Sequence, residues 1–193
     1  MYSPRGAVLV TQGQVPHRLH LIRSGTVAVS SIEPDGAEAS FALRGPRALV
    51  GMEGLAMHPA RSEVRALTPV RTCSATADEI SRWLGPQDSP ARVLFELAMD
   101  SLNAREDDDA LRRGEAVARV ARFLFHWSLL EPRPVLPRQV MARALSMRPE
   151  TLSRCLHRLD EQGLIRHTAA LEVLDRAGLR SLGGAEAPMM AQA

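Results

Sequence analysis

The spacing of apolar residues changes several times along the chain, and each change predicts a different kind of element. Up to about residue 77, short apolar segments alternate with glycine- and proline-containing breaks at intervals of roughly 8–12 residues, the pattern of an all-β sandwich or barrel. Asp35–Gly36, between two alternating runs, is a strong hairpin signal. A short helix is expected to begin near Asp78. Strands are predicted at 8–10, 19–22, 26–29, 39–43, 48–50, 62–66 and 72–75.

Beyond residue 88 the apolar residues recur at helical spacing. Residues 91–113 carry an apolar stripe over their first turns, followed by four acids at 106–109. A long helix of this kind, leaving a barrel, favours pairing with a second copy of itself. Packing back on its own barrel is the alternative. A further amphipathic helix is predicted at 115–130, bounded by Gly114 and a proline-containing break.

Two short amphipathic helices are predicted at 137–145 and 149–162, separated by a tight break. In the second, apolar residues recur at i, i+3, i+4 and i+7. Pro149 occupies the first helical position, where proline is tolerated, and Gly163 follows the last one. Such a pair is either an ordinary helical hairpin or a helix-turn-helix, whose second helix enters a DNA major groove.

After this helix pair the chain returns to strands. Residues 164–167 and 171–174 are predicted to form a two-stranded ribbon. A ribbon that follows a helix-turn-helix is a wing, which commonly lies along the DNA backbone. We expect one last helical turn at 175–182 and a disordered tail of small residues at 183–193.

Composition places the chain among ordinary soluble proteins. It has 193 residues, 45% of them hydrophobic and 24% charged, enough for one large domain or two small ones. No apolar run approaches the ~20 residues that span a bilayer, and the N-terminus lacks the pattern of a secretion signal. Cys73 and Cys155 form neither a metal-ligand nor a redox pair in sequence. These features favour a cytoplasmic protein with reduced thiols.

The positive charge is concentrated at the C-terminal end. All 24 basic residues other than histidine are arginines, and the net charge is +2. Residues 1–88 have nine arginines and eight acids, residues 89–131 have six and eight, and residues 132–193 have nine and six. The excess falls on the segment that contains the helix pair, as contact with phosphates requires.

The order of a β-barrel, a pairing helix and a winged helix-turn-helix resembles the Crp–Fnr superfamily of bacterial transcription regulators. The resemblance extends over nearly the whole chain, although the chain starts late relative to the family, which would trim one edge of the barrel. It is carried by 2–13 and 21–29 in the barrel, 49–54 at the turn before the ligand segment, 119–124 in the helix that leads into the DNA-binding domain, and 149–154 in the recognition helix.

The resemblance implies an α+β fold in four parts. A cyclic-nucleotide-binding-like β-barrel (jelly roll) would cover 1–88, a dimerisation helix 89–113, a winged helix-turn-helix DNA-binding domain 114–182, and the tail 183–193. It also implies a homodimeric transcription regulator that binds double-stranded DNA at a palindromic operator. RNA polymerase would be a further partner if the protein is an activator, a property that the sequence does not reveal.

Three polar residues of the predicted recognition helix are placed to read bases. Glu150, Ser153 and Arg154 are spaced i, i+3 and i+4, so they project from one face near the helix N-terminus, the end that meets base edges. Arginine can donate two hydrogen bonds to guanine, and glutamate can accept one from cytosine.

The Glu–Ser–Arg set is similar to the Fnr branch, whose half-site is TTGAT. The catabolite-activator branch, with TGTGA, has glycine at the position of Ser153 and arginine at that of Pro149. We therefore expect a palindrome close to TTGAT–N4–ATCAA. By resemblance, Arg138 and Gln139 are phosphate contacts. Further phosphate contacts, with solvated side chains as the alternative, are predicted at Arg148, Arg158, Arg166 and His167.

The barrel retains part of a nucleotide site by resemblance. Cyclic-nucleotide-binding members hold the phosphate with an adjacent Arg–Ser pair, which Arg61 and Ser62 match in kind. Met52 replaces the ribose-binding glutamate, and Glu53, one place later, would face the other way on an extended strand. The adenine-contacting pair of the dimer helix has no clear counterpart. Glu53, Arg61 and Ser62 are thus the predicted effector phosphate site, but a cyclic nucleotide is not the favoured effector.

The residue content of the chain also bears on other effectors and functions. The iron–sulfur cluster of the Fnr kind needs several N-terminal cysteines, which the sequence lacks, whereas His17, His20 and His58 leave haem open. A regulator without a ligand is a third option. The alternative function is a ligand-sensing module that acts through a protein partner, with weak or no DNA binding. An enzyme is disfavoured, because the sequence has no nucleophile–base set, metal-ligand spacing or phosphate loop.

Overall fold

The structure, a computed structural model, describes residues 1–34, 36, 38–83, 93–95, 97–99, 113–130, 133–167 and 171–184. The chain divides into two units. The first consists of Met1–Glu106 with Leu130–Pro134, and the second of Asp107–Leu129 with Val135–Ala193. The domain boundaries expected at 88 and 113 remain predictions. Most of the expected disordered tail, from residue 185 on, lies outside the described residues.

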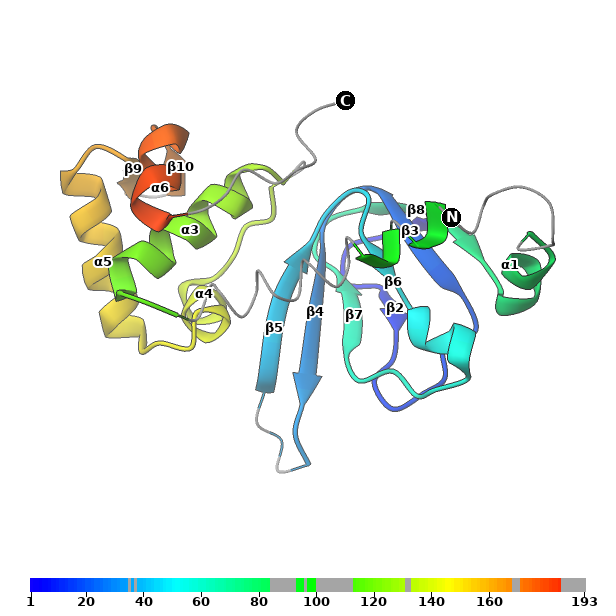
Figure 1. The fold of residues 1–193 in the computed structure, drawn as a ribbon. Coiled ribbons are helices and arrows are strands. Elements are labelled where there is room, and N and C mark those ends of the chain that lie inside the picture. The colour runs from blue at the N-terminus through cyan, green and yellow to red at the C-terminus, as the bar shows by residue number, and fades with distance from the viewer. Residues whose placement is uncertain are drawn as a thin grey trace. The chain divides into compact units, whose positions relative to one another are not determined.

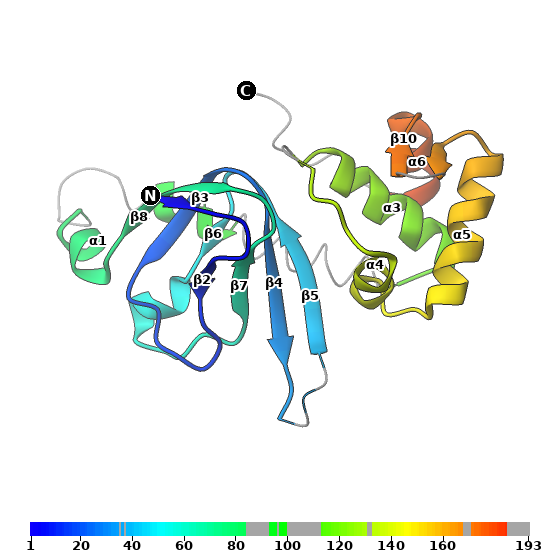
Figure 2. The same cartoon turned by 180° about the vertical axis from the view of Figure 1, so that it is seen from behind.

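The first unit contains two four-stranded antiparallel sheets (Figures 1 and 2). One has the order β1-β8-β3-β6, formed by β1 (Tyr2–Ser3), β8 (Val70–Ala75), β3 (Leu19–Ser24) and β6 (Leu49–Val50). The other has the order β2-β7-β4-β5, formed by β2 (Val8–Val10), β7 (Glu63–Ala66), β4 (Val27–Ile32) and β5 (Glu38–Arg44).

All seven predicted strands are confirmed, with ends that differ by up to three residues, and β1 is an addition. The antiparallel pairing of β4 with β5 confirms the predicted hairpin, although Asp35 of its expected turn lies outside the described residues. The two sheets form a jelly-roll-like sandwich, which confirms the fold class. The strands are hydrogen-bonded in two separate sheets and do not close into a continuous barrel.

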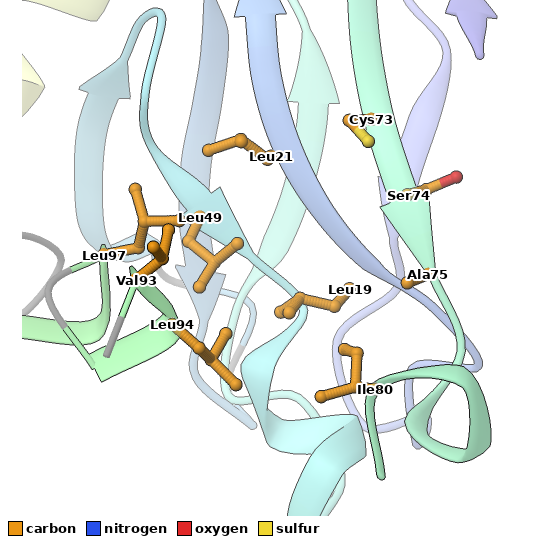
Figure 3. Close-up of a pocket in the computed structure, with 10 residues that line it drawn as sticks. All are labelled: Leu19, Leu21, Leu49, Cys73, Ser74, Ala75, Ile80, Val93, Leu94 and Leu97. Carbon is orange, nitrogen blue, oxygen red and sulfur yellow. The ribbon is translucent and has the colours of Figure 1, made fainter. Parts of the chain in front are cut away.

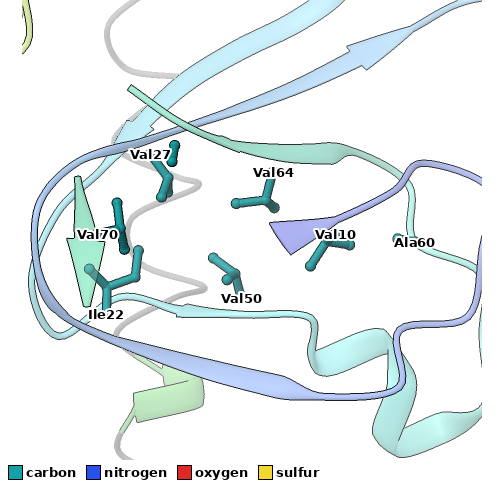
Figure 4. Close-up of a cluster of buried hydrophobic side chains, with 8 residues drawn as sticks. Val10, Ile22, Val27, Val50, Ala60, Val64 and Val70 are labelled. Atoms are coloured by element: carbon teal, nitrogen blue, oxygen red, sulfur yellow. The ribbon is translucent and has the colours of Figure 1, made fainter. Parts of the chain in front are cut away.

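The core of the first unit lies between the two sheets. Ile22 of β3, Val27 of β4 and Val70 of β8 are fully buried there. Small and β-branched side chains dominate, since they pack well between pleated surfaces. Figure 4 shows this cluster, made of Val10, Ile22, Val27, Val50, Ala60, Val64, Ala66 and Val70.

A second apolar cluster lies on the outer face of the first sheet. Because successive residues of a strand face opposite sides, Leu19 and Leu21 point away from the core that Ile22 enters. Leu19 packs with Leu49, Ala75 and Ile80. Leu94 and Leu97, from the segment after the sheets, pack against the same cluster.

Two short helical elements follow strands of the first unit. The 3-10 helix η1 (Met52–Ala56) begins after Gly51, whose φ of 82° is in the left-handed region. A Cβ at Gly51 would lie 2.6 Å from the carbonyl oxygen of Arg18, so only glycine fits this turn. The helix α1 (Ala77–Trp83) confirms the helix predicted near Asp78.

A reciprocal cap fixes the start of α1. The backbone N–H of Glu79 donates to the Thr76 hydroxyl at 3.2 Å, and the backbone N–H of Thr76 donates to the Glu79 carboxylate at 2.7 Å. Further on, residues 93–95 and 97–99 are helical. They confirm part of the helix predicted at 91–113, whose remainder lies outside the described residues.

The second unit is a small helical domain with a ribbon. It consists of α3 (Ala116–Ser128), α4 (Arg138–Ala144), α5 (Pro149–Glu161), β9 (Ile165–His167), β10 (Leu171–Val173) and α6 (Arg176–Gly183). The three predicted helices and the ribbon are confirmed. The last element is longer than the single turn expected: α6 has eight residues, starting after Asp175, whose side chain accepts the N–H of Gly178 at 2.9 Å.

Close contacts hold α3 against α6. A Cβ at Gly183 would lie 2.8 Å from the backbone of Arg122, and the Arg122 guanidinium donates to the Gly183 carbonyl at 2.7 Å. The core of the second unit is fully buried or nearly so at Val120, Leu124, Leu145, Leu152, Leu156, Leu159, Ile165 and Leu179.

Among the described residues, no helix has both the length and the hydrophobicity to cross a membrane.

Candidate nucleic-acid interface

The turn between α4 and α5 is held by hydrogen bonds from both sides. Ser146 adopts a positive φ of 47°, a conformation that ends a helix, and its N–H donates to the carbonyl of Arg143 at 2.9 Å. The N–H of Met147 donates to the carbonyl of Ala142 at 2.9 Å. From α3, the guanidinium of Arg119 donates to the Ser146 carbonyl at 3.5 Å. These contacts define the direction in which α5 leaves the turn.

One face of α5 is buried and the other is in solvent. Leu152, Cys155, Leu156 and Leu159 are at most 5% exposed, as their spacing predicted. Because one face of the helix is thus anchored, its polar side chains have a defined direction.

The three predicted base-reading residues lie together on the solvent face. Glu150, Ser153 and Arg154 are exposed, and within the described part of the chain no hydrogen bond or ion pair engages their side chains. The helix begins with Pro149, and no side chain caps its first turn. The N-cap residue Arg148 thus supplies no side-chain acceptor to the N–H groups of the first turn, an arrangement that favours an approaching anion.

Five of the six predicted phosphate-binding residues are exposed and His167 is half-buried, but they differ in their contacts. Arg166 and Glu172 form an ion pair of 2.8 Å across the ribbon, and Arg158 lies 3.7 Å from Glu115. Exposed pairs of this kind contribute at most about 1 kcal/mol, so both arginines remain available to an anion. Arg138, Gln139 and Arg148 are exposed at the starts of α4 and α5.

Arg138 also contacts the ribbon. Its guanidinium donates to Nε2 of His167 at 2.9 Å. Burial, and after it the charge of Arg138, lowers the pKa of His167 below its usual value of 6.5. A neutral imidazole, with its proton on Nδ1, is the form that can accept this hydrogen bond. The sequence named both residues as separate phosphate contacts and gave no signal that they touch.

Two further residues of α5 differ in their exposure. Cys155 is 5% exposed, and burial raises the pKa of its thiol, so it is a core residue with little thiolate character. His157 is exposed, with Nε2 3.3 Å from the Glu161 carboxylate one turn later.

The predicted effector site is brought together in part. Glu53 and Ser62 line the same cavity of about 60 Å³, together with Gly51. Arg61 is exposed and is not among the lining residues. The expectation that Glu53 faces the other way is wrong, because the backbone there is a 3-10 helix rather than an extended strand. Arg44 lines the cavity as a cation that the sequence reasoning missed, since only the pairing of β5 with β4 brings it there.

The three histidines named for haem lie in different surroundings. His17 and His58 are exposed, whereas His20 is 4% exposed on the inward face of β3. Burial lowers the pKa of His20, and its Nδ1 has no hydrogen-bond partner among the described residues, as is true of the Thr72 hydroxyl. In the same part of the chain, no group of three or more histidine, cysteine or acidic residues is placed to hold a metal ion.

Comparison with known families agrees with both units. Residues 2–85 match the model of the cyclic nucleotide-binding domain, and residues 118–182 match that of the Crp-like helix-turn-helix domain. The chain is a Crp–Fnr family transcription regulator. Its relatives in this family are regulators rather than enzymes.

Individual relatives are distant. The chain is 25% identical over 171 residues to the anaerobic regulatory protein of Pasteurella multocida, a match that covers 83% of this chain and 63% of that relative. It is 24% identical over 174 residues to the CRP-like cAMP-activated global transcriptional regulator of Mycobacterium tuberculosis, a match that covers 84% of this chain and 78% of that relative. The solved structure of FixK2 from Bradyrhizobium japonicum is similar in fold, with a TM-score of 0.78 and 22% identity over 97% of this chain and 98% of that one.

Proposed function

We propose that this Crp–Fnr regulator binds DNA as a homodimer and that α5 reads a TTGAT-like half-site in a palindrome. The observation that carries the proposal is the exposed set of Glu150, Ser153 and Arg154 near the N-terminus of α5, with no partner within the described chain. Arg154 can take guanine and Glu150 cytosine. Sequence identity does not choose between half-sites, because relatives named as anaerobic and as cAMP-activated regulators match almost equally well.

Phosphate contacts supply most of the affinity in this proposal. Arg138, Gln139, Arg148, Arg158 and Arg166 are exposed on α4, α5 and β9, the elements that would approach the backbone. Each phosphate contact releases counterions, so binding is expected to weaken steeply with salt. A DNA-binding regulator of this kind would act in the cytoplasm, with RNA polymerase as a further partner if it activates.

Dimerisation through the helix that follows the sheets is part of the proposal. On the described turns of that helix, Phe95 is 64% exposed and Met99 is 39% exposed. The two are four residues apart and therefore lie on one face. Large apolar side chains exposed together mark an interaction surface, and a second copy of the same helix is the partner that a palindromic operator requires.

Fluorescence anisotropy with labelled duplexes tests this function at one stated salt concentration. A duplex carrying TTGAT–N4–ATCAA should bind at least about tenfold more tightly than one with TGTGA arms, because each mismatched base pair costs ~1–3 kcal/mol. Selection from random DNA that returns TGTGA arms would overturn the half-site. Equal, weak binding to every duplex would instead favour a module that acts through a protein partner.

A further inference from the structure

A second and larger cavity lies on the outer face of the first sheet, away from the core. It has a volume of about 300 Å³. Strands β3, β6 and β8 form one side, and α1 and the helical segment that contains Val93, Leu94 and Leu97 form the other (Figure 3). The lining residues are Leu19, Leu21, Leu49, Cys73, Ser74, Ala75, Ile80, Val93, Leu94 and Leu97.

The lining selects against charge. None of the ten lining side chains is charged, and seven are leucine, isoleucine or valine. Ser74 pairs with His20 in the sheet, on the face opposite to Leu21 and Cys73, so its hydroxyl is turned away from the cavity. The Cys73 thiol is therefore the polar group best placed to meet an occupant. A charged molecule would lose its hydration here and gain no partner.

The size of the cavity indicates what it holds. Small-molecule sites have volumes of roughly 300–1,000 Å³, so this cavity is at the lower end of that range. The cavity beside Glu53 and Ser62 is five times smaller, about 60 Å³. Apolar ligands bind in cavities of this kind because binding removes the apolar surfaces of both the ligand and the protein from water.

We propose that this outer cavity binds a small uncharged apolar molecule, an aliphatic chain or an aromatic ring, as a regulatory ligand. An occupant would touch the sheet through Leu19 and Leu49 and the helical segment through Leu94 and Leu97. That segment leads along the chain into the second unit. Binding would thus change the free energy with which the helical segment packs against the sheet. The effect of that change on DNA binding rests on the proposed function.

The binding test uses an uncharged fluorescent probe and needs no DNA. N-Phenyl-1-naphthylamine fluoresces more strongly in apolar surroundings, so the full chain should enhance its emission. The n-alkanols from butanol to decanol should displace it with affinity that rises with chain length until the cavity is filled. Octanoate, with the same chain as octanol but a carboxylate, should displace it at least about tenfold less well. Equal displacement by octanoate would overturn the proposed chemistry.

The two cysteines provide a second test on the unaltered protein. Cys73 is exposed and Cys155 is buried, so 5,5′-dithiobis(2-nitrobenzoate) should modify Cys73 first. Saturating octanol should slow that reaction severalfold without exposing Cys155. Protection of Cys73 that rises with protein concentration and not with octanol would mean that a second copy covers the cavity, which would overturn the proposal.

A filling variant and a matched control complete the design. Cys73→Trp should abolish enhancement of the probe, while Arg71→Trp, on the same strand and the same face but outside the cavity, should keep it. Circular dichroism establishes that both variants fold. The protection of native Cys73 by octanol tests the proposal without the use of either variant. DNA affinity is then measured with and without octanol. Probe binding without any DNA binding would contradict only the proposed function.

Discussion

Arg138, the first residue of α4, donates a hydrogen bond of 2.9 Å to Nε2 of His167, the last residue of β9. The contact joins the first helix of the helix-turn-helix to the ribbon across 29 positions of the chain. It needs the imidazole in its neutral form, because a doubly protonated ring has no lone pair to accept with.

This contact predicts a loss of stability in acid. The pKa of His167 is lowered in the folded protein, so the unfolded chain takes up the proton first. The free energy of unfolding should be highest above pH 6.5, the usual value, and fall as the pH drops below it towards the lowered value. Urea unfolding between pH 7.5 and 5 measures this fall.

His20 has a pKa lowered in the same direction, so variants are needed to separate the two. His167→Gln, which keeps an acceptor but does not titrate, should reduce the acid-induced loss. His17→Gln, at an exposed position, should leave it unchanged. An undiminished loss in His167→Gln would assign the effect to other groups.

Arg154→Ala should weaken binding to the TTGAT operator and relax specificity at one base pair. The expected loss is ~1–3 kcal/mol, and it should disappear when that base pair is changed. Anisotropy titrations with single-base operator variants measure both effects. Gln162→Ala, exposed beyond the C-terminal end of α5, is the control and should bind like the parent. A uniform loss over all operator variants would make Arg154 a phosphate contact.

Arg138→Gln should weaken binding to all sequences alike. Removal of one phosphate contact should also reduce the slope of log affinity against log salt by about 1. Titrations at several salt concentrations give the slope. Arg82→Gln, an exposed arginine of α1, should not change it. An unchanged slope in Arg138→Gln would mean that this guanidinium only supports the ribbon.

Cyclic AMP and cyclic GMP should bind at millimolar concentration or not at all. The cavity beside Glu53 and Ser62 is about 60 Å³, well below the volume of an ordinary ligand site, and Arg61 does not line it. Titration calorimetry with each nucleotide tests this expectation. Micromolar binding that Arg61→Ala abolishes would restore the cyclic-nucleotide site.

Phe95→Glu should convert the protein from a dimer into a monomer. A carboxylate in place of a largely exposed apolar ring would be buried without a partner in a helix pair. Sedimentation velocity measures the mass, and Ile32→Glu, at an apolar side chain 56% exposed on β4, is the control. An unaltered dimer in Phe95→Glu would place the dimer contact on another surface.

Periodicity predicted the strands well because it reports local burial. The elements it missed depend on distant parts of the chain. The two residues of β1 are a strand only because they pair with Arg71 and Val70 of β8. The 3-10 helix η1 follows a glycine that must pass close to the carbonyl of Arg18, a contact that no local pattern encodes.

The candidate interface shows the same division. Helical spacing alone was enough to place Glu150, Ser153 and Arg154 on the solvent face of α5. The partner of Arg166 could also be predicted, because the register of the ribbon sets Glu172 opposite it. The contact of Arg138 with His167 was not, since it depends on how the ribbon packs beside α4.

Leu49 lines both the inner cavity beside Glu53 and the outer cavity beside Leu94. The two-residue strand β6 therefore borders both cavities, with the Leu49 side chain packed in the outer cluster. A molecule that displaces this strand from one side takes volume from the other. Two occupants would then compete without touching, and by thermodynamic reciprocity each would weaken the other by the same factor.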